Sequence, residues 1–186
     1  FVRMALADQL PGLEGCTTTV FDSLTYSGTM SNLDDVKDSD RFAFIRGDIR
    51  DTKQVGTAIP GHDAVVHFAA ESHVDRSVTD SRIFVETNVV GTQTLLDQAL
   101  ASEISRFIHI STDEVYGSID EGSWDEQHSL LPNSPYSASK AASDLLVRSY
   151  HVTHGLNTSI TRCSNNYGTH HFPEKVIPLF VTNLLD

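Results

Sequence analysis

Tyr136 and Lys140 are the residues of this sequence whose types and spacing first suggest chemistry. They stand at the head of a predicted helix that continues through Tyr150, and a separation of four residues places their side chains on one helix face. A lysine ammonium beside a phenol favours the phenolate, and a tyrosine acting as a base near neutral pH needs its pKa of about 10 lowered by about 2–3 units. The pair therefore predicts proton transfer by tyrosine, with the lysine, helped by a cationic cofactor ring, lowering the tyrosine pKa.

A second cluster, Thr112, Asp113 and Glu114, follows the short apolar run 106–110. This run is β-branched and bounded by polar residues, which is typical of a buried parallel strand. In open α/β sheets, ligands bind in the crevice outside the carboxyl ends of the strands. The cluster is therefore expected to face a ligand.

Each motif also has a plain structural interpretation. Ser111-x-x-Glu114 fits a helix capping box. Tyr136 after Pro135 fits a surface aromatic at a helix start, and Lys140 fits a solvated lysine. The occurrence of both motifs together, one at a strand end and one at a helix start, favours the chemical interpretation.

The elements that position these motifs alternate between strand and helix along the chain. Short β-branched runs predict strands at 17–21, 42–46, 64–68, 106–110 and 157–161. Helical patterns cover 1–10, 51–59 with Asp51 as its cap, 79–101 and 135–153. This alternation, without internal repeats, predicts an α/β fold with a doubly wound parallel sheet.

The end of the first predicted strand suggests which strands of that fold are present. Asp22 ends this strand, as does the acid that binds a ribose hydroxyl in dinucleotide-binding βαβ units, although a turn or cap residue is the plainer interpretation. The five strands then correspond to the second to sixth in the order 3-2-1-4-5-6. The first strand and its glycine-rich pyrophosphate turn are absent, which leaves a gap at the sheet centre and predicts poor autonomous stability. Because both ends lie within helical patterns, we expect a fragment of a longer protein.

Composition limits the classes of partner. The 186 residues are enough for one domain with a sizeable core, and 13 Lys and Arg against 25 Asp and Glu give a formal net charge of −12. That charge argues against nucleic acid or an anionic membrane as a partner. Cys16 and Cys163 favour free thiols in a reduced compartment, and the absence of a long apolar run or signal peptide predicts a cytoplasmic protein. The nine histidines show no metal-ligand spacing, and His67 and His109 fit core histidines, so no metal is expected.

A resemblance to a known family covers essentially the whole chain. It is carried by segments 21–28, 68–77, 162–168 and 172–175, by the Tyr-x-x-x-Lys spacing and by the Thr-Asp-Glu triplet. The sequence resembles the extended short-chain dehydrogenase/reductases and, within them, the dTDP-glucose 4,6-dehydratases. The triplet is the discriminating motif, because related epimerases and GDP-mannose dehydratases usually carry another residue in place of its Asp.

This resemblance implies a lyase with bound NAD that is reduced and reoxidised within one turnover. Tyr136 would take the proton of the sugar's 4-hydroxyl, Lys140 would hold the nicotinamide ribose, and Thr112 would bond the 4-oxygen. Glu114 would remove the C5 proton, and Asp113 would protonate the departing 6-hydroxyl. Asp113 must then be neutral while Glu114 is ionised, a split that adjacent carboxyl groups favour.

The resemblance also implies a set of binding residues. The cofactor would contact Asp22, Ser23, Leu24, Thr25, Asp48, Ile49, Phe68, Ala69, Ala70, Ser72, Thr87, Tyr136, Lys140 and Asn166. The dTDP-glucose substrate would contact Ser72, Thr112, Asn165, Lys175 and Val176. A domain boundary is expected after Gly168, with 1–168 as the NAD-binding domain and 169–186 as the start of the nucleotide-sugar region. A homodimer would use the helices 79–101 and 135–153.

Three alternatives stay open at this point. The protein could act on another nucleotide sugar, or it could be a 4-epimerase, although an epimerase needs no acid at C6. It could also be a non-catalytic NAD-binding module, given the missing glycine-rich turn and the sequence Gly168-Thr-His-His171 in place of the more usual Gly-Pro-x-x. Trp124, in an acidic loop, either packs over the site or anchors the loop.

Overall fold

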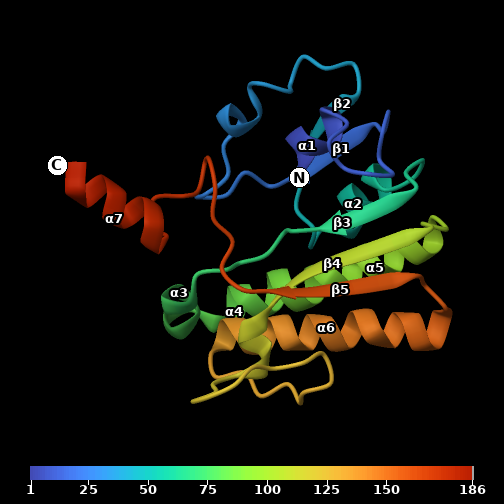
Figure 1. The fold of residues 1–186 in the computed structure, drawn as a ribbon. Helices are drawn as coiled ribbons and strands as arrows, with labels where there is room; N and C mark the ends of the chain where they lie inside the picture. Colours follow the sequence, from blue (N-terminus) through green and yellow to red (C-terminus); the bar gives the residue numbers. More distant parts are fainter. Residues whose placement is uncertain (186) are drawn as a thin grey trace. The chain divides into compact units, whose positions relative to one another are not determined.

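Five parallel strands form two sheets in the computed structural model, which describes residues 1–185 (Figure 1). The chain divides into two compact units, each described here by itself. Unit 1 consists of Phe1–Arg46 and the segment that begins at Asn166, and unit 2 is Gly47–Asn165. The boundary expected after Gly168 and the assignment of 169–186 to a nucleotide-sugar region stay predictions.

Unit 2 contains a sheet of three strands in the order β3 (Ala64–His67), β4 (Arg106–Thr112) and β5 (Thr158–Cys163). The register pairs Ile108 with Val66 on one side and with Ser159 on the other. Because the strands are parallel, the segments that follow β3 and β4 emerge at the same edge of the sheet. That edge is where the sequence places its chemical motifs.

The helices of unit 2 account for most of its buried apolar surface. They are α2 (Thr52–Ala58), α3 (Val74–Thr79), α4 (Ser81–Phe84), α5 (Thr92–Ala101) and α6 (Pro135–His154), with the 3-10 turn η3 (Asp113–Tyr116). Helices α5 and α6 lie side by side along the sheet (Figure 1). Phe84 of α4, Leu96 of α5, Val147 of α6 and Phe107 of β4 are fully buried.

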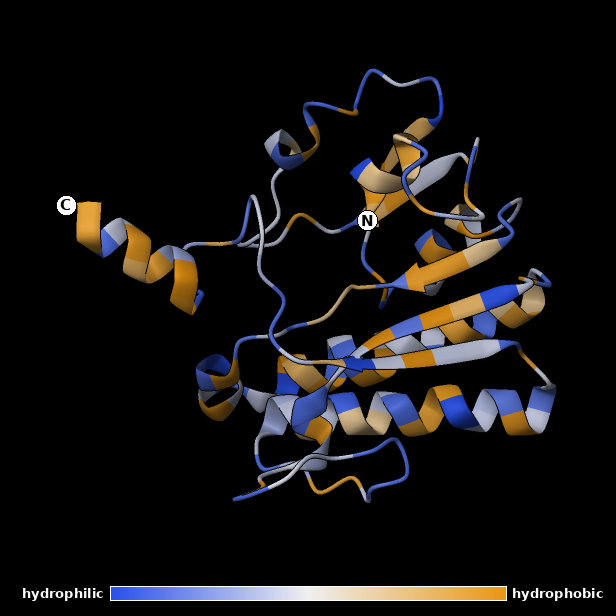
Figure 2. Cartoon of the chain, viewed as in Figure 1, coloured by the Kyte–Doolittle hydropathy of each residue, from blue (hydrophilic) through white to orange (hydrophobic). Residues whose placement is uncertain are grey.

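Unit 1 contains a sheet of two strands, β1 (Thr18–Asp22) and β2 (Phe42–Arg46). Helix α1 (Val2–Leu6), the 3-10 turn η1 (Met30–Leu33) and helix α7 (Val176–Leu185) complete it. An ion pair of 2.8 Å between Arg41 and Asp8 ties the segment before β2 to the segment after α1. Figure 2 shows α7 as apolar along its length, and none of its described side chains is buried.

The expected fold class is confirmed. The orders β2–β1 and β3–β4–β5 are the two parts of the 3-2-1-4-5-6 order that remain when the first strand is removed. Within residues 1–185, no strand pairs with β1 on the side away from β2. The predicted cap of α2 is also confirmed, because the Asp51 carboxylate accepts hydrogen bonds from the backbone of Lys53 and Gln54.

The predicted helix 79–101 is wrong as a single α-helix. Its middle, η2 (Val85–Gly91), is a π-helix, and a separate short helix, α3, ends at Thr79. Gly91, the last residue of η2, packs closely against Ile49, since a Cβ there would lie 2.5 Å from Cδ1 of Ile49. Strands β4 and β5 also extend two residues further than expected, to Thr112 and Cys163.

Across the described residues, no helix combines the length and the apolar character needed to cross a bilayer.

Candidate active site

Thr112 organises the turn that carries the two carboxylates. It is the last residue of β4, and its Oγ1 accepts a hydrogen bond of 3.2 Å from the backbone N–H of Glu114. The same hydroxyl donates to Oδ1 of Asp113 at 3.4 Å. Thr112 therefore caps η3, and the alternative capping box with Ser111 is wrong because Ser111 lies within β4.

The start of α6 is tightly specified by its first residues. Ser134 and Ser137 form a capping box, and Pro135 occupies the first turn, where its missing N–H costs nothing. Tyr136 is 9% exposed and Lys140 is 4% exposed. Neither is the solvated surface residue of the alternative interpretation. Nζ of Lys140 donates a hydrogen bond of 2.7 Å to the carbonyl of Ile110, which fixes the helix start against β4.

The Tyr136 phenol lies near enough to Thr112, Asp113 and Glu114 for all three to affect its pKa, which joins the two sequence motifs in one site. Burial, followed by the charge of Glu114, raises the pKa of Tyr136 to about 12, while Thr112 acts in the opposite direction. The expectation that Lys140 lowers this pKa is therefore not met in the protein alone. The reason is that the phenol lies in a buried environment beside carboxylates, whereas the Lys140 ammonium binds the Ile110 carbonyl.

Burial lowers the pKa of Lys140 to about 8, and the charge of Asp144 acts against that effect. Burial lowers the pKa values of two buried histidines further from their ordinary value. Burial, with the charge of Lys140, lowers the pKa of His67 to about 3 and that of His109 to about 2. Their assignment as core histidines is confirmed by burial, and Nε2 of His67 lies 2.9 Å from Oγ1 of Thr92.

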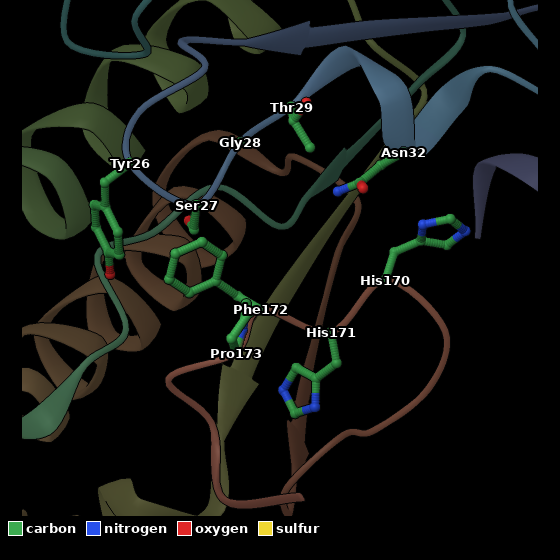
Figure 3. A pocket seen from close by; sticks show the side chains of 9 residues that line it. All are labelled: Tyr26, Ser27, Gly28, Thr29, Asn32, His170, His171, Phe172 and Pro173. Atoms are coloured by element: carbon green, nitrogen blue, oxygen red, sulfur yellow. The ribbon is translucent and has the colours of Figure 1, made fainter. Parts of the chain in front are cut away.

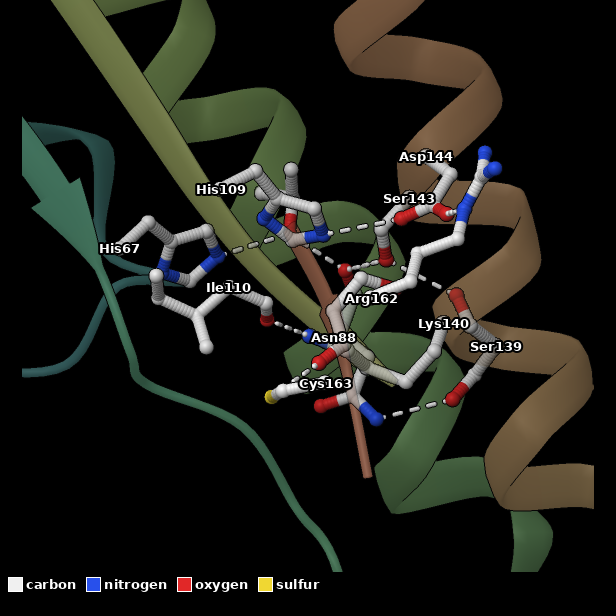
Figure 4. Close-up of polar contacts among 12 residues, drawn as sticks. His67, Asn88, His109, Ile110, Ser139, Lys140, Ser143, Asp144, Arg162 and Cys163 are labelled. Atoms are coloured by element: carbon white, nitrogen blue, oxygen red, sulfur yellow. Dashed lines mark hydrogen bonds and ion pairs between the residues drawn. The ribbon is translucent and has the colours of Figure 1, made fainter. Parts of the chain in front are cut away.

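A polar network around Asn88 connects three elements of the site (Figure 4). Its side chain accepts a hydrogen bond from the backbone N–H of Glu71 and donates to the Glu71 carbonyl, both at 2.9 Å. It also donates to Oγ of Ser139 at 2.8 Å, while Ser143 donates to the Asn88 carbonyl. The network links the exit of β3, the π-helix and α6, and sequence reasoning recognised only that Asn88 interrupts an apolar face.

The predicted cofactor residues of unit 2 surround the carboxyl edge of the sheet. Phe68, Ala69, Ala70 and Ser72 occupy the segment between β3 and α3, and the Phe68 ring is 55% exposed. Thr87 lies in the π-helix. Two further predicted residues precede α2. Asp48 pairs with Arg50 at 2.6 Å, which lowers its pKa, and Ile49 is buried under Gly91.

The other predicted binding residues belong to unit 1 or to its border. Oδ1 of Asp22 accepts a hydrogen bond of 2.6 Å from the backbone of Leu24, whose φ is 50°. Asp22 is thus a turn residue in this structure, and its contact with a ribose stays a prediction. Ser23 and Thr25 lie in the same loop. Asn165 ends unit 2, whereas Asn166, Lys175 and Val176 belong to unit 1, and Val176 begins α7.

Unit 1 also contains a pocket (Figure 3). Its aromatic wall is an edge-to-face pair of Tyr26 and Phe172, with ring centroids 5.7 Å apart. His170 and His171, which distinguish this sequence from the usual family pattern, lie on its rim. The remaining lining residues are Ser27, Gly28, Thr29, Asn32 and Pro173.

Trp124 anchors the loop that follows η3. Its ring stacks on Tyr116 with centroids 5.7 Å apart, and the guanidinium of Arg162 lies 5.1 Å from the Tyr116 ring centre. In residues 1–185, no group of three or more His, Cys, Asp or Glu side chains is arranged to hold a metal ion. Cys16 and Cys163 are free thiols.

Comparison with known proteins gives consistent matches. The family model described as GDP-mannose 4,6 dehydratase matches residues 5–186. The dTDP-glucose 4,6-dehydratase of Streptomyces niveus is 55% identical over 186 residues, which is 100% of this chain and 55% of that protein. That of Streptomyces antibioticus is 61% identical over 168 residues, or 90% of this chain and 49% of that protein. The chain thus spans about half the length of these curated relatives.

A solved structure matches equally well. DesIV, a dTDP-glucose 4,6-dehydratase from Streptomyces venezuelae crystallised with NAD, superposes with a TM-score of 0.97 at 56% identity. The match covers 99% of this chain and 57% of that one.

Proposed function

This chain belongs to the GDP-mannose 4,6 dehydratase family, and we propose that its protein converts dTDP-glucose into dTDP-4-keto-6-deoxyglucose and water with NAD as cofactor. The observation that carries the proposal is the position of the Tyr136 phenol beside Thr112, Asp113 and Glu114, all of which affect its pKa. It unites the carboxylate turn and the Tyr–Lys pair in one site. The relatives that carry the name dTDP-glucose 4,6-dehydratase support the choice of sugar nucleotide.

The residues of unit 2 fit NAD. The small side chains of Ala69 and Ala70 let a ligand approach the backbone at the carboxyl edge, and the exposed Phe68 ring lies beside them. The Lys140 ammonium, near the phenol of Tyr136, supplies donors for ribose hydroxyl groups. When bound, NAD would accept hydride from C4 of the sugar and return it to C6.

The chain's own residues would move the protons. Tyr136 accepts the proton of the 4-hydroxyl, and a hydrogen bond donated by Thr112 would favour the resulting phenolate, since Thr112 acts to lower the pKa of Tyr136. Glu114 removes the C5 proton, which the 4-ketone has made acidic, and returns a proton to C5 when C6 receives hydride. Asp113 donates a proton to the 6-hydroxyl as it leaves as water. Both carboxylates follow the capped end of β4, so one short turn serves both steps.

The test is a product assay by proton NMR on the full-length protein with NAD and dTDP-glucose. We expect a new C6 methyl doublet beside a 4-keto or hydrated carbon. A galactose-type product would instead support the 4-epimerase, and tight NAD binding without turnover would support another nucleotide sugar or a non-catalytic module.

The state and location of the protein also remain proposals. A homodimer through the helices of 81–101 and 135–154 is supported by the exposure of Leu145 and Val152, which lie two helical turns apart on α6. A cytoplasmic location, and the lack of nucleic acid or membrane partners, are supported by the net charge of −12.

A further inference from the structure

A row of ionisable side chains, here called the ladder, continues from the Tyr–Lys pair along the same face of α6. Tyr136, Lys140 and Asp144 are spaced by four residues, so each lies one turn beyond the last. Asp144 is 1% exposed, and its Oδ2 accepts a hydrogen bond of 2.8 Å from Nε of Arg162 on β5 (Figure 4). The ladder therefore ends in a buried ion pair that the proposed proton transfers do not use.

Lys140 needs a counter-charge. A buried ammonium is costly unless an anion lies near, and loss of its proton is the usual outcome. Its hydrogen bond to the Ile110 carbonyl satisfies one donor but supplies no negative charge. A protonated Lys140 is required if it is to favour the phenolate of Tyr136.

Asp144 is the carboxylate that lies one helical turn from Lys140 on the same face of α6, and its charge acts to raise the pKa of Lys140. His109 lies 3.5 Å from Oδ1 of Asp144 and is neutral at ordinary pH, because burial lowers its pKa to about 2. His67 is neutral for the same reason. The titratable and charged groups around the ladder are Tyr136, Lys140 and Asp144 of α6, His67 of β3, His109 of β4, Arg162 and Cys163 of β5, and Asp113, Glu114 and Tyr116 of η3.

We propose that Asp144 is a positioning residue for the reaction: its carboxylate, held ionised by Arg162, keeps the buried Lys140 protonated beside Tyr136. Burial raises the pKa of Asp144, and the Arg162 hydrogen bond opposes that rise. Arg162 is itself fixed by a hydrogen bond of 2.8 Å to the Tyr116 hydroxyl. The effect of Asp144 on catalysis rests on the proposed function. Its effect on the protonation of Lys140, here called the charge relation, does not.

The charge relation is tested by carbon NMR of the NAD-loaded enzyme, which needs no turnover. The Lys140 signal is assigned from Lys140→Arg, and its titration midpoint is compared between the wild type and Asp144→Asn. Loss of a neighbouring opposite charge shifts a pKa by roughly 1–3 units. We therefore expect the titration midpoint of Lys140 to fall by at least about one pH unit in Asp144→Asn. Asp97→Asn is the matched control, since Asp97 on α5 accepts a hydrogen bond from Tyr150 instead, and it should leave the midpoint unchanged.

The catalytic consequence is tested by the pH profile of turnover. The ratio of wild-type to Asp144→Asn activity should be near 1 at pH 6 and about tenfold at a pH one unit above the wild-type midpoint. A loss that is equal at every pH, or a Lys140 midpoint that does not move, would show a merely structural ion pair and overturn the proposal.

A wild-type measurement keeps the test valid if Asp144→Asn does not fold. The carboxyl carbon of Asp144 should show the ionised form from pH 6 to pH 9, and a protonated carboxyl at pH 7 would overturn the proposal. If the charge relation holds and the wild type forms no dehydrated sugar, the proposed function fails while the role of Asp144 toward Lys140 stands.

Discussion

Tyr136 lies among groups that oppose its ionisation, and this makes it a sensitive probe of the site. Its phenol is buried, its ring packs edge-to-face on Phe84 with centroids 6.4 Å apart, and carboxylates are its nearest charges. The hydroxyl therefore matters for proton transfer, whereas the ring matters for packing. These two roles can be separated by a single substitution.

Tyr136→Phe should remove proton transfer and keep the fold. We expect turnover to fall by about 10²–10⁴-fold, the usual contribution of a general base, since the ring and its contact with Phe84 are retained. NMR product assays give the activity, and urea unfolding provides the control for stability. Activity within tenfold of the wild type would rule out Tyr136 as the base.

Asp113 and Glu114 are predicted to act in different steps, and deuterium exchange separates them. In Asp113→Asn, the C6 methyl product should disappear while C5 still exchanges with D₂O, because Glu114 can still remove its proton. In Glu114→Gln, exchange at C5 should stop as well. Proton NMR of the recovered sugar nucleotide follows both positions. Equal loss of C5 exchange in the two variants would contradict this division of roles.

At the scale of elements, the π-helix η2 is the distortion that fits the helical segment between α4 and α5 to the site. A π-turn leaves backbone carbonyls without their regular helical partners, and such segments occur frequently at functional sites. Here the Asn88 carbonyl accepts hydrogen bonds of 2.6 Å from both Thr92 and Ser143. The distortion is thus stabilised by hydroxyl groups of two helices.

Gly91→Ala should destabilise unit 2, since the new Cβ would lie 2.5 Å from Cδ1 of the buried Ile49. Overpacking of this kind costs about 1–3 kcal/mol of unfolding free energy. Urea unfolding monitored by circular dichroism measures it. The matched control is Gly56→Ala in α2, where the nearest atom is the flexible end of Gln98 at 3.0 Å and alanine improves helix propensity. Equal stability of both variants would show that the tight contact relaxes freely.

At the scale of the whole molecule, stability should depend on pH through the two buried histidines. The folded-state pKa values of about 3 for His67 and about 2 for His109 lie below the unfolded value of about 6.5. The unfolded chain therefore binds more protons in that interval. The contribution is fully present above about pH 6.5 and is lost as pH falls toward the folded values. Asp144, whose pKa is raised, contributes in the opposite sense.

Unfolding free energy should fall from pH 6.5 to pH 4 with a slope on the order of 1 kcal/mol per pH unit for each histidine. Urea unfolding at several pH values measures this slope. His109→Gln should reduce it, whereas His128→Gln, at an exposed position, should leave it unchanged. An identical slope in His109→Gln would show that carboxylates alone govern the acid sensitivity.

The sequence by itself determined the elements and their order. Alternating apolar runs and helical periodicity encode local structure, so all five strands were predicted to within two residues at each end. The Thr-Asp-Glu triplet and the Tyr–Lys pair were found for the same reason. Each is a short motif, and its place at a strand end or a helix start follows from the local pattern.

Only the tertiary structure decided how these parts act on one another. The position of Tyr136 beside Thr112, the hydrogen bonds to Asn88 in the π-helix and the pairing of Asp144 with Arg162 join segments from different elements. Such contacts depend on which side chains are buried together, and burial sets the pKa values of the site. Periodicity carries no record of that packing, and so the raised pKa of Tyr136 and the counter-charge of Lys140 emerge only once the elements are assembled.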